Sequence, residues 1–156
     1  MNAVRIEKFQ NGQEKQISRL IKQVYDEFVS PDYSTEGNKF FYDWIDPLKI
    51  AERQKGQRNI LVALSGPEMV GVIEIRNNNT VSLLFVDKEY QRQGIAKRLF
   101  NEALKDCVQR NPTLKKVFVH ASPFSIPIYK KLGFQETAPI QIENGIKYLP
   151  MQKELG

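Results

Sequence analysis

The spacing of hydrophobic residues changes between residues 60 and 119, and this change limits the folds open to the chain. Short apolar runs rich in β-branched side chains and separated by tight turns predict an antiparallel meander of three strands. These runs are residues 60–64, 69–75 and 81–86. From residue 95 the apolar positions recur in pairs four apart, which predicts an amphipathic helix that Asn111 and Pro112 end.

A short strand at residues 117–119 follows this helix. A strand, a helix and a second strand in this order form a right-handed parallel crossover, so the sheet is expected to contain one parallel β-α-β step. The remaining predicted elements begin with a strand at residues 4–9 and helices at 17–28 and 40–48, the second kinking or restarting at Pro47. A short helix to about residue 132, the segment 134–136 and a last strand near 146–149 complete the chain. With no internal repeat or linker, residues 1–156 are predicted to form one α+β domain with a mixed, mostly antiparallel sheet and flanking helices.

The composition bears on location, redox chemistry and partners. No run approaches the roughly 18 apolar residues of a membrane span, and the first residues lack the apolar core of a signal peptide, so a cytoplasmic protein is expected. Cys107, the single cysteine, falls among apolar helix positions, which favours a buried thiol over a nucleophile and excludes a cysteine cluster for a metal. The net charge of +5 is compatible with nucleic acid, but the basic residues are scattered, which favours a solvated surface partly facing a phosphate-bearing cofactor.

Residues 86–96 join a strand end to a helix start and have the properties of a phosphate-binding turn. The first N–H groups of a helix lack intrahelical partners, and the helix dipole favours negative charge there. Gly94 removes a side chain where an anion would approach the backbone, and Arg92, Lys97 and Arg98 add positive charge. The turn has neither the P-loop spacing nor the three glycines of a dinucleotide fingerprint. Taken alone, Gly94 could also simply begin the helix.

Two motifs in this part of the chain resemble those of the GNAT superfamily of N-acetyltransferases. Residues 91–96 (QRQGIA) match the family signature Gln/Arg-x-x-Gly-x-Gly/Ala, and residues 129–134 (YKKLGF) are similar to its Tyr-x-Lys-x-Gly-Phe motif. The order of the predicted elements is also the family's order, so the resemblance covers nearly the whole chain. It implies a single-domain GNAT fold of the bacterial type, with three layers in the order α/β/α.

The resemblance implies acetyl-CoA as co-substrate and a set of residues that bind it. Backbone amides of the signature turn would hold the pyrophosphate, and the strand before the turn and the helix after the crossover would contact pantetheine. The cofactor-binding residues implied in this way are Leu84, Phe85, Val86, Gln91, Arg92, Gln93, Gly94, Ile95, Ala96, Ser122 and Ser125. Ser122 and Ser125 stand where the family usually has Asn and a small residue, so these contacts to pantetheine can differ here.

Direct attack of a primary amine on the thioester, with two proton transfers, is the reaction that the resemblance implies. Tyr129 matches the family's general acid, with a plain core aromatic as the alternative. Glu74 is the best carboxylate for the base, although it could also be solvated or paired with a lysine, and a water chain could replace it. His120, the only histidine, has an ordinary pKa of about 6.5 that suits a base or a substrate contact.

The acceptor is expected to enter between the first two helices and the C-terminal strands. The sequence does not choose among aminoglycosides, polyamines, amino acids and peptide lysines as the acceptor. The residues predicted for that region are Tyr33, Phe40, Phe41, Tyr42, Trp44, Glu143 and Tyr148. Two other functions are weighed against the enzyme: a GNAT-fold protein that binds acyl-CoA with little chemistry, and a nucleic-acid-binding domain. The last strand could pair at the edge of a homodimer.

Overall fold

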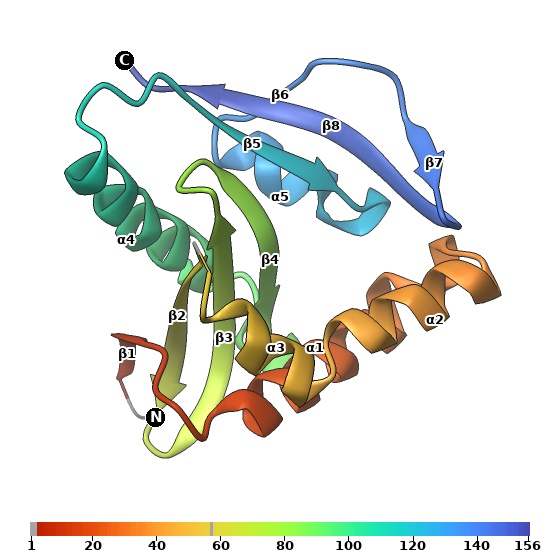
Figure 1. Ribbon diagram of the computed structural model, residues 1–156, viewed down its shortest axis with the longest axis horizontal. Helices are drawn as coiled ribbons and strands as arrows, with labels where there is room; N and C mark the ends of the chain where they lie inside the picture. Colours follow the sequence, from red (N-terminus) through yellow and green to blue (C-terminus); the bar gives the residue numbers. More distant parts are fainter. Residues whose placement is uncertain (1–2, 57) are drawn as a thin grey trace.

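The computed structural model describes residues 3–56 and 58–156, whose strands form a mixed sheet (Figure 1). The order across the sheet is β1-β2-β3-β4-β5-β8-β6, and β7 pairs with β8. The strands are β1 (Val4–Lys8), β2 (Arg58–Ser65), β3 (Glu68–Arg76), β4 (Thr80–Val86), β5 (Lys116–Ala121), β6 (Gln135–Glu136), β7 (Gln141–Glu143) and β8 (Ile146–Glu154). The helices are α1 (Glu14–Phe28), α2 (Thr35–Trp44), α3 (Pro47–Arg53), α4 (Ile95–Arg110) and α5 (Ile126–Lys131), with short 3-10 turns η1 (Ser30–Asp32), η2 (Lys88–Tyr90) and η3 (Pro123–Ser125).

The strands β4 and β5 run parallel but pair over a short distance only. Antiparallel pairing joins β1 to β2, β2 to β3 and β3 to β4, and β4 then pairs parallel to β5 across α4. The predicted meander and β-α-β step are therefore confirmed. The parallel register consists of Thr80 with Phe118 and Val81 with Val119. Beyond Val81 the two strands diverge, which leaves one edge of β4 free of a neighbouring strand (Figure 1).

Helices cover both faces of the sheet and give the three layers in the predicted α/β/α order (Figure 1). On one face α4 and α5 bury side chains such as Leu99 and Tyr129 against the strands. Gly71 lets α4 approach β3, because a side-chain carbon at this position would lie 3.1 Å from Leu99 Cδ1. On the other face α1 and α3 bury Ile21 and Ile50 in a second core. None of the described helices is both long and apolar enough to cross a membrane.

The start of α3 and the end of β8 show how the sequence determines where elements begin and end. The Asp46 carboxylate accepts a hydrogen bond of 2.9 Å from the N–H of Leu48, and Pro47 begins α3, where its missing N–H has no cost. The predicted restart at Pro47 is thus confirmed. The last strand is longer than predicted and runs to Glu154 instead of ending near Leu149, because it pairs with the whole of β5.

Candidate functional site

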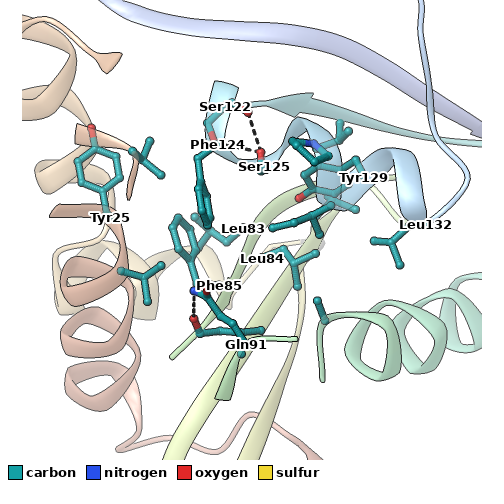
Figure 2. A pocket seen from close by; sticks show the side chains of 18 of the residues that line it. Tyr25, Leu83, Leu84, Phe85, Gln91, Ser122, Phe124, Ser125, Tyr129 and Leu132 are labelled. Atoms are coloured by element: carbon teal, nitrogen blue, oxygen red, sulfur yellow. Dashed lines mark hydrogen bonds between the residues drawn. The ribbon is translucent and has the colours of Figure 1, made fainter. Parts of the chain in front are cut away.

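A cavity of about 800 Å³ lies where β4 and β5 diverge (Figure 2). Its wall comes from β4, the turn before α4, the first residues of α4, the end of β5, and α5. The opposite wall comes from α1, the segment after it, and α2. The elements predicted to bind the cofactor and the first two helices, predicted to border the acceptor, therefore meet around one space, whereas the C-terminal strands predicted for the acceptor do not line it.

The strand β4 contributes Leu84, Phe85 and Val86 to this cavity. Its edge toward β5 is not paired beyond Val81, so backbone N–H and C=O groups along it are available to a ligand. A ligand that carries amides in an extended chain could add to this edge as a further strand does. The position of these three residues thus fits the pantetheine contacts that the sequence predicts.

The turn before α4 has the backbone geometry of an anion site. Gly94 has a φ of +81°, and no heavy atom lies within 4 Å of where its side chain would begin. The Gln91 amide donates a hydrogen bond of 3.0 Å to the carbonyl of Val86 and fixes the turn to the end of β4. Within the helix the first bond runs from the N–H of Arg98 to the carbonyl of Gly94, so the N–H groups of residues 95–97 are left for a ligand.

Positive charge at this turn comes from Arg92 and Lys97, which both line the cavity. Arg98 does not, because its guanidinium donates to the carbonyl of Val4 at 2.9 Å. The Gln93 side chain also lies outside the cavity wall and donates to the carbonyl of Glu89. The helix start and two cations together favour a phosphate at this end of the cavity.

Residues from η3 and α5 form a further part of the cavity wall. The hydroxyls of Ser122 and Ser125 lie 2.9 Å apart, and both residues line the cavity. Tyr129 is only 4% exposed and reaches the cavity from α5 (Figure 2). Burial raises the pKa of its hydroxyl above the ordinary value, so this phenol stays protonated and can donate a proton. No described residue accepts a hydrogen bond from the Tyr129 hydroxyl.

Glu74 does not line the cavity but is connected to it. Its side chain is fully buried, and one carboxylate oxygen lies 3.2 Å from Arg53 Nε. The other oxygen accepts a hydrogen bond of 2.8 Å from the hydroxyl of Ser82, which does line the cavity. Arg53 is held in turn by the carbonyl of Trp44 at 2.7 Å and by the face of its ring. Glu74 therefore pairs with an arginine, not with a lysine or with solvent, and reaches the cavity only through Ser82.

His120 lines the cavity near the end of β5, and its ring stacks on Tyr148 with centroids 4.2 Å apart. Burial and the charge of Arg76 lower the pKa of His120, and Glu143 partly opposes them. The imidazole is therefore neutral at neutral pH and free to accept a proton. His120 and Tyr129 are the two predicted catalytic residues whose side chains the structure brings to the cavity.

The wall formed by α1 and α2 is aromatic. Tyr33 and Phe41, predicted near the acceptor, line the cavity. The others predicted there lie outside its wall: Phe40, Tyr42, Trp44, Glu143 and Tyr148. Tyr25 and Phe124 also line the cavity, although nothing in the sequence singled them out. The only signal was indirect, since Tyr25 continues the apolar face of α1 and Phe124 follows the proline that opens η3.

Other chemistry has less support in the described residues. Cys107 is buried in the core beneath α4, as predicted, and burial raises the pKa of its thiol. Such a thiol is a poor nucleophile at neutral pH. The described residues contain no group of three or more His, Cys, Asp or Glu side chains placed to hold a metal ion.

Comparison with known proteins agrees with this geometry. Residues 29–155 match the family described as acetyltransferase (GNAT) domain. The N-acetyltransferase YafP of Escherichia coli is 26% identical over 143 residues, which cover 92% of this chain and 89% of that protein. The GCN5-related N-acetyltransferase from Rhodopseudomonas palustris superposes with a TM-score of 0.82 at 19% identity, over 99% of this chain and 96% of the other. PaiA N-acetyltransferase from Thermoplasma acidophilum, in complex with coenzyme A, gives a TM-score of 0.77 at 18% identity over 98% and 99%.

Proposed function

The chain belongs to the GNAT acetyltransferase family, and from this premise we propose that it moves the acetyl group of acetyl-CoA by direct attack to a primary amine of a separate acceptor. It is an acetyltransferase with acetyl-CoA as co-substrate. One observation carries the finer proposal. A single cavity contains the free edge of β4, the unpaired N–H groups at the start of α4, Tyr129 and His120.

The residues present fit acetyl-CoA along the length of this cavity. The pyrophosphate suits the start of α4, where Gly94 leaves space and Arg92 and Lys97 supply positive charge. The pantetheine amides suit the free edge of β4. The acetyl end would then lie toward Tyr129 and His120, and a β4 N–H near Phe85 would polarise its carbonyl as an oxyanion hole does.

We assign the proton transfers to the two side chains that reach the cavity. Neutral His120 takes a proton from the acceptor ammonium, and the free amine then attacks the carbonyl carbon. As the C–N bond forms, the C–S bond breaks, and the departing thiolate takes the proton of the Tyr129 hydroxyl. The nitrogen, which still carries one proton too many after the attack, releases that proton to solvent, and solvent returns a proton to the Tyr129 phenolate and removes the one on His120. Glu74 would reach an acceptor only through Ser82, so we assign it to positioning that hydroxyl.

The first test is binding, measured as thermal stabilisation by acetyl-CoA, CoA and ATP. Stabilisation by both CoA forms, and not by ATP, is expected because the β4 edge recognises pantetheine. The second test follows thiol release from acetyl-CoA with a panel of amines. Binding without release for any amine would contradict the enzymatic proposal and favour an acyl-CoA-binding or sensor protein.

A further inference from the structure

The composition of the cavity wall around the acceptor end narrows the substrate class. Resting on the amine acetylation proposed above, we propose that the acceptor is a small molecule with one positively charged amine on an aromatic or other apolar group. A polycation, such as a polyamine or an aminoglycoside, is the alternative that this inference rejects.

The acceptor end of the cavity is lined by aromatic rings from four elements or segments. Tyr25 of α1 stacks on Phe41 of α2 with centroids 4.0 Å apart and planes at 4°, and Phe41 lies 6.1 Å from the ring of Phe85 of β4. Tyr33, from the segment after η1, meets Tyr25 edge to face at 5.8 Å. Figure 2 shows Tyr25 on the side away from Leu132, with Phe124 and Phe85 between them. Tyr25 is fully buried behind Phe41, whereas Tyr33, Phe41 and Phe85 are half-buried. An apolar or aromatic group would replace water on these three half-buried rings favourably.

The charges around the cavity argue against a polycation. No Asp or Glu is found among the described residues that line it, and its charged residues are Arg92, Lys97 and Lys131. The nearby acids Asp26, Asp32 and Glu143 are exposed and lie outside the wall. One ammonium can be stabilised by the ring faces through cation–π interaction. A second or third ammonium would find no carboxylate in the wall and would lose hydration without compensation.

The tyrosines do not supply the missing negative charge. The hydroxyl of Tyr25 donates a hydrogen bond of 2.6 Å to Asn38 Oδ1. Burial raises the pKa of Tyr33 to about 12, so its phenol is neutral throughout the physiological range. These groups can orient a polar substituent, but they cannot neutralise a cation.

A clasp formed by Ser34 and Gly145 joins α2 to the turn between β7 and β8 beside the aromatic wall. The N–H of Ser34, next to α2, donates to the carbonyl of Gly145 at 3.2 Å, in the turn between β7 and β8. Gly37 and Gly145 approach so closely that a side-chain carbon on Gly37 would overlap the Gly145 carbonyl. In Figure 1 the turn between β7 and β8 lies beside the start of α2. Because Ser34 follows Tyr33 and α2 carries Phe41, the clasp helps to hold the aromatic wall in place.

The test compares kcat/KM for two groups of amines with acetyl-CoA. 2-Phenylethylamine and tryptamine represent single amines on apolar groups, while spermidine and kanamycin represent polycations. We expect at least tenfold higher kcat/KM for the aromatic amines. Phe41→Leu should lower their kcat/KM about fivefold or more and leave the KM of acetyl-CoA unchanged. Phe40→Leu is the matched control, because Phe40 is on the same helix but is 49% exposed and outside the wall.

Each outcome separates the inference from the function on which it rests. Equal or better turnover of spermidine or kanamycin would overturn the inference and leave amine acetylation standing. Acetylation of none of these amines by a protein that still binds acetyl-CoA would overturn both. Equal losses for Phe41→Leu and Phe40→Leu would show that the aromatic wall does not select the acceptor.

Discussion

Ser82 donates a 2.8 Å hydrogen bond to Glu74, and this contact joins the cavity to a fully buried ion pair. Glu74→Gln would leave Arg53 charged and only 10% exposed at its side chain, without its carboxylate. Because removing one partner leaves a buried charge uncompensated, we expect a loss of about 3–5 kcal/mol in unfolding free energy. Urea unfolding of the purified variant would measure it.

The exposed pair of Arg5 and Glu7 provides the control for this substitution. Their Nε and Oε2 atoms lie 2.8 Å apart, but Glu7 is 42% exposed at its side chain. Glu7→Gln should therefore change the unfolding free energy by no more than about 1 kcal/mol. Equal effects of the two substitutions would contradict a structural role for the buried pair.

Gly94→Ala tests the anion site at the start of α4. The φ of +81° is strained for Ala, so we expect a loss of about 1–2 kcal/mol in stability. The added methyl group would also stand where a phosphate approaches, which should raise the Kd of CoA at least tenfold. Calorimetric titration with CoA measures the second effect separately from the first.

Gly12 offers a matched substitution away from the cavity. Its φ is +103°, and no heavy atom lies within 4 Å of an added side-chain carbon, as at Gly94. Gly12→Ala should therefore cost similar stability and leave the Kd of CoA unchanged. If Gly94→Ala and Gly12→Ala bound CoA equally well, the pyrophosphate would have to lie elsewhere.

The features that could be predicted from sequence are those whose requirements are local. The restart at Pro47 depends on the residue before it, and the turn at Gly94 depends on a backbone angle that glycine adopts readily. The β-α-β step follows from changes in hydrophobic period along one stretch of chain. Such signals do not need knowledge of which distant residues come together.

The acceptor wall and the environment of Glu74 depend on contacts between distant segments. An aromatic residue on the apolar face of a helix gives the same pattern whether it meets a core or a cavity, so Tyr25 could not be assigned to a site. Glu74 stood alone in a strand, and its partner Arg53 lies on a different element, 21 residues earlier. Most of the residues predicted for the cofactor therefore line the cavity, whereas most of those predicted for the acceptor do not.

Tyr129→Phe tests the proton donor. The substitution keeps a ring in the core, where Tyr129 and Phe134 meet edge to face at 5.3 Å, and removes only the hydroxyl. Loss of a general acid should lower kcat about 10²–10⁴-fold, with the Kd of CoA unchanged. Tyr148→Phe is the control, since its hydroxyl donates to Gln141 and lies outside the cavity wall. A near-normal kcat for Tyr129→Phe would show that Tyr129 only packs in the core and is not the proton donor.

His120 predicts a pH dependence of stability with a defined sign. Because the fold lowers the pKa of His120, the unfolded chain binds its proton more readily. The stabilising contribution is therefore complete above the unfolded pKa of about 6.5 and is lost as pH falls through the lower folded pKa. His120→Asn should lose less stability than the unmodified protein between pH 7 and pH 5. Parallel stability profiles for the two proteins would contradict the shift.

Gly37→Ala tests the clasp between α2 and the turn that joins β7 to β8. The added carbon would overlap the carbonyl of Gly145, and backbone on both sides leaves little room to adjust. Forced overpacking of this kind costs about 1–3 kcal/mol, so we expect a lower melting temperature. Since the clasp borders the acceptor wall, the KM of the amine should change while the KM of acetyl-CoA does not.

In the control Gly56→Ala, the nearest heavy atom to the added carbon is 3.6 Å away, so both KM values should stay unchanged. A shift in the KM of acetyl-CoA for Gly37→Ala would mean that the clasp controls the cofactor end instead.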